Sequence, residues 1–200
     1  MRQPGRLHRI GHLVRRFLGS LWPGGPSPED EDWVAGLLGD GELELWRQMS
    51  GADRRHAVGV ARRVDHLLGL PAGPGPVADA GDVTGSGAPV MEDDPAGPVM
   101  AAALLHDVGK VRSGLGTFGR VAATLLGAAA PDRANGWLDR GGFRGRVGLY
   151  LRHPEEGADL LSGAGSDPFT VAWALEHHRP SDRWSVDRRL ADVLHAADDD

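Results

Sequence analysis

The sequence predicts an all-α fold for this chain of 200 residues. Apolar residues recur at spacings of three and four through most of the chain, which is the period of an amphipathic helix. Alternation of apolar and polar residues with a period of two, which would indicate strands, does not persist anywhere. Gly, Pro, Ser and Asp fall between the periodic segments, where they are expected to end one helix and begin the next.

The composition of the chain argues against some functions and limits which residues could bind a metal. The formal net charge of −6 argues against stable nucleic-acid binding, which needs a dominant basic surface. The chain has no cysteine, so any metal must be held by histidine and carboxylate groups. No apolar run has the length of a signal peptide or of a membrane span, so we expect a cytoplasmic protein without a transmembrane segment.

Residues 1–49 are expected to form a helical extension. Within it, residues 6–22 place Leu7, Ile10 and Val14 on one face of an amphipathic helix whose other faces carry arginine. Such a helix either packs on the domain or a partner, or lies on a membrane surface. After the intervening prolines, the acidic residues 29–32 are expected to start a second helix that runs through Leu38.

Residues 50–200 are expected to form the main domain. Ser50 followed by Asp53 is typical of a helix N-cap, and residues 54–70 keep a helical apolar period. Residues 71–98 are rich in proline and glycine without periodicity, which predicts a flexible surface insertion outside the core, with Pro98 as the first helical residue of the segment that follows. Further helices are expected over residues 99–107, 115–129, 143–151, 154–162, 168–178 and 186–198.

The helix expected over residues 99–107 is almost entirely apolar until it reaches His106 and Asp107. Burying an imidazole and a carboxylate without partners is unfavourable, and a divalent cation would compensate both. These ligand types suit Fe, Mn, Zn, Co or Ni better than Ca. Adjacent side chains diverge by about 100° on a helix, so the helix end must bend for both to bind, and Gly109 offers a bend.

The stretch Ala-Ala-Ala-Leu-Leu-His-Asp-Val-Gly-Lys that ends at Lys110 resembles the signature of the HD superfamily of metal-dependent phosphohydrolases. The resemblance covers roughly residues 50–200 and implies an HD-domain helical bundle. It implies an earlier histidine, matched by His56, and a later aspartate, matched by Asp198 at the end of the last helix. Asp192, in the same helix, remains the alternative to Asp198.

Three further histidines resemble the subset of HD proteins that binds two metal ions, which includes the HD-GYP phosphodiesterases. The whole ligand set that this resemblance implies is His56, His106, Asp107, His153, His177, His178 and Asp198. The Gly-Tyr-Pro motif of HD-GYP proteins is absent, because the chain continues from His178 as Arg-Pro-Ser-Asp-Arg-Trp. This departure disfavours cyclic di-GMP hydrolysis and favours a more generic phosphohydrolase.

The resemblance also suggests roles. Asp107 is the candidate bridging carboxylate between two divalent ions, with Fe or Mn preferred and Mg, Co, Ni or Zn compatible. His56, His106 and Asp198 would complete the coordination of one ion. His153, His177 and His178 would complete the coordination of the other. Proximity in the sequence to these ligands, and not the resemblance, suggests the remaining roles. Lys110, the only lysine of the chain, is a candidate catalytic residue that neutralises phosphate charge, and Arg179 and Arg183 are candidates to bind a second phosphate.

The expected function is hydrolysis of a nucleotide or another phosphate monoester or diester by a metal-activated hydroxide. Two alternatives stay open. Some two-iron relatives with a similar ligand set are oxygenases, and a further class would be a non-catalytic metal-binding module for sensing or scaffolding, docked through residues 6–22.

Overall fold

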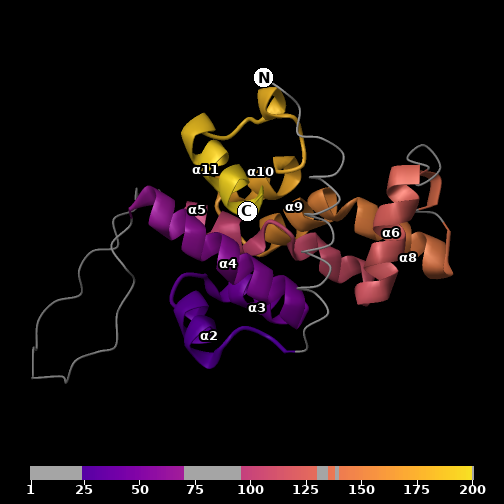
Figure 1. Ribbon diagram of the computed structural model, residues 1–200, viewed down its shortest axis with the longest axis horizontal. Helices are drawn as coiled ribbons and strands as arrows, with labels where there is room; N and C mark the ends of the chain where they lie inside the picture. Colours follow the sequence, from indigo (N-terminus) through magenta and orange to yellow (C-terminus); the bar gives the residue numbers. More distant parts are fainter. Residues whose placement is uncertain (1–23, 70–95, 130–134, 138–139, 200) are drawn as a thin grey trace, which may run out of the picture.

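The computed structural model describes residues 24–69, 96–129, 135–137 and 140–199, and in these residues every regular element is a helix (Figure 1), which confirms the all-α prediction. The predicted helix over residues 6–22 and residues 71–95 of the predicted insertion lie outside the described residues. The α-helices are α2 (Pro28–Ala35), α3 (Asp40–Gln48), α4 (Gly51–Leu68), α5 (Ala96–Leu105), α6 (Thr117–Ala129), α8 (Gly142–Leu151), α9 (His153–Gly163), α10 (Pro168–Glu176) and α11 (Arg188–Asp199). The 3₁₀-helices are η1 (Val108–Ser113), η2 (Asn135–Trp137) and η3 (Ser181–Arg183).

Helix α5 occupies the centre of the main core. Every residue from Val99 to Leu105 is buried, and the helix packs against α3, α4, α10 and α11. A helix that is apolar on all sides can only be stable as a core element, and each fully buried leucine contributes about 1.5–3 kcal/mol. Among the described helices, none combines the length and hydropathy needed to cross a membrane.

Glu31 of α2 accepts hydrogen bonds from α3 and from α4 and so links the three helices. The Trp46 indole donates a hydrogen bond to one Glu31 carboxylate oxygen at 2.8 Å, and Arg54 donates to the other at 2.8 Å. Trp46 is fully buried and, with Val34, belongs to the same hydrophobic core as α5. Residues on both sides of residue 50 therefore contribute to one core.

Helix α3 has no counterpart in the sequence-based prediction. It spans only nine residues and contains Gly41, so its apolar period is short and its helix propensity is weakened. The Glu42 carboxylate accepts a hydrogen bond from the Gly39 backbone N–H at 3.1 Å, which caps the start of the helix. The helix predicted to run from residue 29 through Leu38 ends at Ala35 instead, and α3 begins five residues later.

Helix α4 shows the predicted cap. The Ser50 hydroxyl accepts from the Asp53 backbone N–H at 3.2 Å and donates to the Asp53 carboxylate at 2.7 Å. The helix begins at Gly51, three residues before the predicted start, and ends at Leu68, because Gly69 adopts the left-handed conformation with φ 61°.

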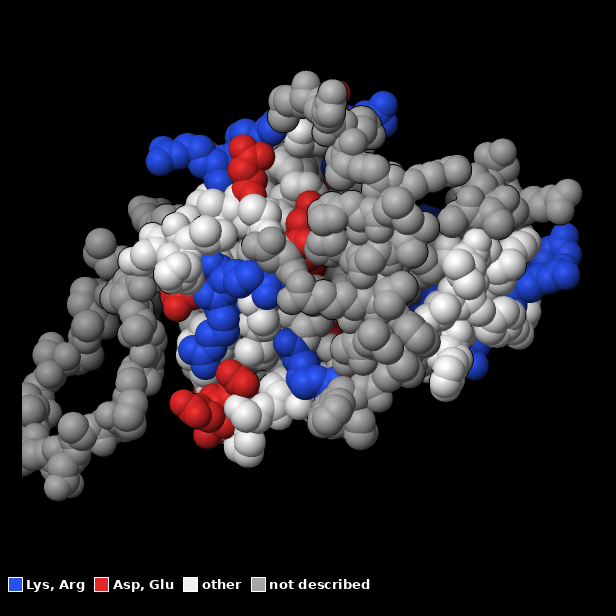
Figure 2. All heavy atoms as spheres, viewed as in Figure 1, with Lys and Arg blue, Asp and Glu red and all other residues white. Residues whose placement is uncertain are grey.

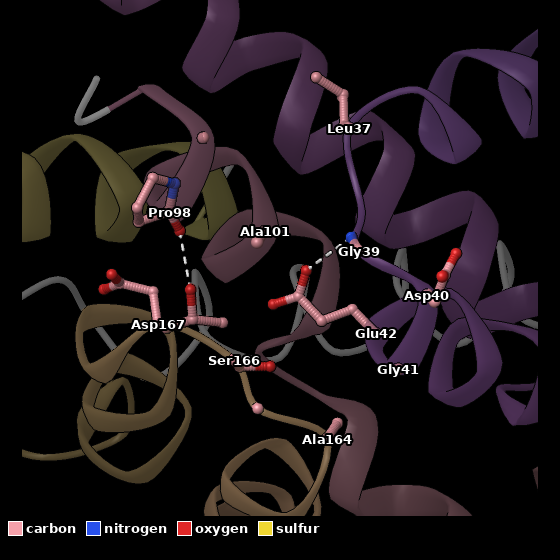
Figure 3. A pocket seen from close by; sticks show the side chains of 13 residues that line it. Leu37, Gly39, Asp40, Gly41, Glu42, Pro98, Ala101, Ala164, Ser166 and Asp167 are labelled. Atoms are coloured by element: carbon pink, nitrogen blue, oxygen red, sulfur yellow. Dashed lines mark hydrogen bonds between the residues drawn. The ribbon is translucent and has the colours of Figure 1, made fainter. Parts of the chain in front are cut away.

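The predicted insertion over residues 71–98 is wrong at its C-terminal end, because α5 begins at Ala96. Pro98 is therefore the third helical residue and not the first; proline is tolerated throughout a first turn, where backbone N–H groups lack helical partners. The Pro98 carbonyl accepts a hydrogen bond from Thr170 of α10 at 3.0 Å, which fixes this turn against the core (Figure 3).

A pocket of about 280 Å³ lies beside this contact, between α3, the start of α5 and the turn from α9 to α10 (Figure 3). Its polar lining includes Asp40, Glu42, Ser166 and Asp167. None of the predicted metal ligands lines it, so this pocket is separate from the chemistry that the sequence predicts.

Helices α6 and α8 form a lobe at one end of the molecule, on the right of Figure 1. The lobe has a small core of its own, in which Leu115, Ala123 and Val147 are buried apart from the main cluster. Arg120 connects α6 to the main core by an ion pair with Asp53 of α4. The α6–α8 lobe is therefore attached to the domain and adds little to its main core.

Candidate metal centre

The His106–Asp107 doublet directly follows the last residue of α5. His106 and Asp107 are 2% and 3% exposed, and Asp107 has φ −100° and ψ 6°, which ends the α-helix before the 3₁₀-helix η1 begins. The bend that both ligands need therefore occurs at the doublet itself. Gly109 is not among the glycines with positive φ, so the expectation that it supplies the bend is wrong, and its small size serves a packing role instead.

One group of potential ligands joins three helices. His56 comes from α4, His106 follows α5 and Asp198 comes from α11. The Asp198 carboxylate oxygen Oδ1 lies 2.9 Å from His56 Nε2 and 3.7 Å from His106 Nε2. These ligand atoms lie within 4.8 Å of one another, close to the separation of about 4.2 Å that opposite ligands have around one ion with bonds of about 2.1 Å.

The second group contains Asp107, His153, His177 and His178. Asp107 Oδ1 lies 3.3 Å from His153 Nε2 and 3.8 Å from His177 Nε2, while His153 Nε2 lies 3.1 Å from His178 Nε2. The other Asp107 oxygen, Oδ2, lies 3.5 Å from His106 Nε2 of the first group. The two oxygens of Asp107 thus face different groups.

Three of the histidines are oriented by the same local contact. The Nδ1 of His106, of His153 and of His177 each lies 2.8–3.0 Å from a backbone carbonyl three residues earlier. The acceptors belong to the last turns of α5, α8 and α10, where carbonyl groups have no helical partner. With Nδ1–H donated to that carbonyl, Nε2 is left as the free lone pair that binds a metal. The acceptor residues are Ala103, Tyr150 and Ala174.

Three polar atoms of the cluster are buried without a hydrogen-bond partner: His106 Nε2, Asp107 Oδ1 and His177 Nε2. Each such atom costs about 1–3 kcal/mol when it stays unsatisfied. All three are electron-pair donors, so cations bound to the two groups of ligands would satisfy them. The set of imidazoles and carboxylates fits Fe, Mn, Co, Ni or Zn by ligand type. The residues present therefore fit the metal that the sequence predicts.

The charged groups of the cluster shift one another's pKa values. Burial opposes ionisation of Asp107, but the positive charges of Lys110 and His106 outweigh burial and hold the Asp107 pKa well below its usual value. Burial would lower the pKa of His106, yet the charges of Asp107 and Asp198 raise it. For His177, burial lowers the pKa and remains the dominant effect. Asp107 is therefore an anion, the form that binds a metal.

Lys110 contacts the cluster of potential ligands through Asp107. Its ammonium donates a hydrogen bond to Asp107 Oδ2, the oxygen that faces His106. Burial would lower the pKa of Lys110, but the charge of Asp107 raises it, so the side chain is a cation. The structure thus gives Lys110 a contact with the candidate bridging carboxylate, which the sequence alone did not indicate.

The predicted phosphate-binding arginines follow the paired histidines and are exposed. Arg179 lies 3.6 Å from the Glu176 carboxylate, with 42% of its side chain exposed, and Arg183 belongs to η3. Asp192, the alternative to Asp198, is exposed and accepts from Arg188 at 2.9 Å, away from the cluster. Between the two aspartates, the structure brings only Asp198 to the histidines.

Sequence reasoning missed Glu176, which is buried beside His177. Its carboxylate accepts hydrogen bonds from the Ser185 backbone N–H at 2.6 Å and from the Ser185 hydroxyl at 2.9 Å. The indole of Trp184 donates to the Glu176 carbonyl at 3.1 Å. These contacts fasten the segment after His178 to the end of α10. The available signal was an acidic residue at the end of an otherwise apolar helix.

Comparisons of the chain with protein-family models, with curated proteins and with solved structures found no match.

Proposed function

We propose that this protein is an HD-type metal-dependent phosphohydrolase that acts on a nucleotide or another phosphate ester. The observation that carries the proposal is the position of Asp107, whose oxygens lie 3.5 Å from His106 Nε2 and 3.3 Å from His153 Nε2. A carboxylate between two groups of imidazoles suits a site for two divalent ions. Two divalent ions held by these residues would polarise the phosphoryl oxygens of a substrate and supply hydroxide near neutral pH.

The chain's own residues would hold and orient this centre. His56, His106 and Asp198 would bind one ion, and His153, His177 and His178 the other, with Asp107 between them. The backbone carbonyls behind His106, His153 and His177 fix the rings so that Nε2 faces inward. Fe or Mn is the preferred metal, because imidazole-rich sites with carboxylates suit them and the site has no thiolate.

A substrate would reach the centre from the side where the ligands are accessible. His178 is exposed, and the side chains of His56 and Asp198 are 28% and 16% exposed, whereas His106 and His177 are buried. Lys110 holds Asp107 ionised and places a positive charge beside the reacting phosphate. Arg179 and Arg183 lie on the exposed segment after His178 and would bind a second phosphate.

The test is phosphate release by the full chain, loaded with Mn²⁺ or Fe²⁺ under anaerobic conditions, from nucleotides and from bis(p-nitrophenyl) phosphate. Asp198→Asn should lower kcat/KM by at least about a hundredfold, since loss of a ligand or its support costs metal affinity and activity. Asp192→Asn is the matched control from the same helix and should keep the activity of the wild type, because Asp192 contacts only Arg188 among the described ion pairs.

Three outcomes would contradict the proposal. The first is that no phosphate ester is hydrolysed although elemental analysis finds bound metal, which would favour a sensing or scaffold module. The second is turnover that requires oxygen, which would favour a two-iron oxygenase. The third is equal loss of activity in the Asp198 and Asp192 variants, which would indicate that helix α11 contributes through folding alone.

A further inference from the structure

The α6–α8 lobe exposes several large apolar side chains. Phe118 and Leu125 of α6 are 77% and 65% exposed, and Phe143 of α8 is 51% exposed. Phe118 and Leu125 are seven residues apart, which places them on the same face of their helix. Leu126 beside them is 37% exposed. Of the large hydrophobic residues recorded as exposed in the described chain, all but Leu67 lie in this lobe.

Arginine outnumbers the acidic residues in and around this lobe. From Arg112 to Arg152 the sequence carries seven arginines and two aspartates, Asp132 and Asp139, which lie outside the described residues. The described arginines are Arg112, Arg120, Arg140, Arg144, Arg146 and Arg152, of which Arg120 pairs with Asp53. Figure 2 shows an uncharged surface over α6 bordered by blue side chains. A basic lobe stands out on a protein whose net charge is −6.

Residue 24, the first described residue, lies near this lobe. A Cβ atom at Gly51 would lie 2.7 Å from the Gly24 carbonyl oxygen, so residue 24 packs against the start of α4. Two residues further along α4, Asp53 pairs with Arg120 of α6, which is two residues from Phe118. The sequence of residues 6–22 predicts a second basic and apolar element, connected at this point.

We propose that the exposed apolar side chains of the α6–α8 lobe, Phe118, Leu125, Leu126 and Phe143, bind an anionic lipid surface. Exposed aromatic and leucine side chains enter the boundary between headgroups and acyl chains, while the surrounding arginines are attracted to acidic headgroups. The sequence predicts that residues 6–22 are also basic and apolar, so they would be attracted to the same acidic surface.

The experiment is co-sedimentation of the full chain with vesicles of phosphatidylglycerol and phosphatidylcholine, compared with vesicles of phosphatidylcholine alone. The protein should bind only the acidic vesicles, and less as ionic strength rises. Phe118→Glu with Leu125→Glu should lower the partition coefficient at least about tenfold, because it removes apolar contact and adds repelled charge. Leu67→Glu, which changes an exposed leucine outside the lobe, should bind as the wild type does.

A second pair of variants tests the charges. Arg144→Glu should weaken vesicle binding, whereas Arg47→Glu, on the exposed surface of α3, should leave it unchanged. Circular dichroism and metal content of every variant should match the wild type, since none of these side chains belongs to the metal centre.

Several results would overturn the proposal. One is the absence of binding to acidic vesicles, including the case in which the lobe binds duplex DNA or an acidic protein instead. Another is vesicle binding that the Phe118 and Leu125 changes leave intact, which would assign it to residues 6–22 alone. A third is self-association of the wild type without vesicle binding, abolished by the same changes, which would make these side chains an interface between copies of this chain.

Discussion

Gly109 packs so closely against His153 that a Cβ atom at position 109 would lie 1.9 Å from the His153 carbonyl oxygen and 2.5 Å from the Gly157 backbone nitrogen. The contact joins η1, which follows the His106–Asp107 doublet, to the start of α9, which carries His153. Only glycine permits this approach, because real Cβ atoms do not come so close to backbone atoms. The spacing between the two groups of ligands therefore depends on Gly109.

Gly109→Ala should destabilise the fold and weaken metal binding together. Overpacking a close contact costs about 1–3 kcal/mol, and the backbone of His153 would have to shift to admit the methyl group. Urea unfolding with and without Mn²⁺ measures both effects. Gly163→Ala, at the end of the same helix α9, is the control, because a Cβ atom there meets nothing within 4 Å. Equal stability of the two variants would show that the 109–153 contact is not tight.

His153→Ala should reduce the metal content from the proposed two ions per chain to about one, and Asp107→Asn should reduce it further, because Asp107 faces both groups of ligands. Elemental analysis of the purified full chain measures the stoichiometry. His195→Ala provides the control, since this exposed histidine pairs with Asp199 outside the cluster. Retention of two ions by the Asp107 variant would contradict the bridging role.

Removal of the metal by a chelator should lower the melting temperature. The buried atoms His106 Nε2, Asp107 Oδ1 and His177 Nε2 lose their proposed partner, and an ion present at 100 times its Kd stabilises the folded state by about 2.7 kcal/mol. For a domain of this size we expect a shift of roughly 5–10 °C, from about 2–4 °C per kcal/mol. Differential scanning calorimetry before and after chelation measures it, and an unchanged transition would argue against a resident ion.

Glu176→Gln should weaken the attachment of the segment after α10. The carboxylate accepts two hydrogen bonds from Ser185, and a neutral amide with a single acceptor oxygen cannot replace both. We expect a loss of about 1–3 kcal/mol in unfolding free energy. A change at this position should also lower the affinity for metal, because His177 and His178 follow it directly. Asp192→Asn, an exposed acidic residue on α11, should change neither quantity.

Glu31→Gln should lower the free energy of unfolding, because it weakens the hydrogen bonds that link α2 to α3 and α4. Glu31 accepts from Trp46 and from Arg54 with different oxygens, and the Arg54 contact is charge-assisted. The amide keeps one acceptor, so we expect a loss of about 1–2 kcal/mol, measured by urea unfolding. Glu29→Gln, in the exposed first turn of the same helix, is the control. Metal content should stay at the wild-type value, since Glu31 lies outside both ligand groups.

The central helix and the doublet could be predicted from sequence because their signals are local. An apolar run that ends at His106 and Asp107 indicates a buried helix end, and the structure shows both side chains buried there. The end of α4 was predicted two residues too late, at residue 70, because the prediction did not use Gly69, whose left-handed conformation ends the helix at Leu68.

Other features depend on contacts between distant residues and leave no local signal. The function of Gly109 is set by a backbone 44 positions later, at His153. The contact of Lys110 with Asp107 depends on the turn that follows α5, and the choice of Asp198 over Asp192 depends on how α11 packs on α4. Helix α3 was missed because its stability comes from Trp46 and its tertiary partners more than from its own propensity.

The rings of His106, His153 and His177 are aimed by peptide carbonyls and not by neighbouring side chains. Substituting Ala103, Tyr150 or Ala174 would leave each acceptor in place, so mutagenesis of those side chains would not turn the rings. The direction of the coordinating nitrogens therefore depends on where α5, α8 and α10 end, and not on which side chains occupy these three positions.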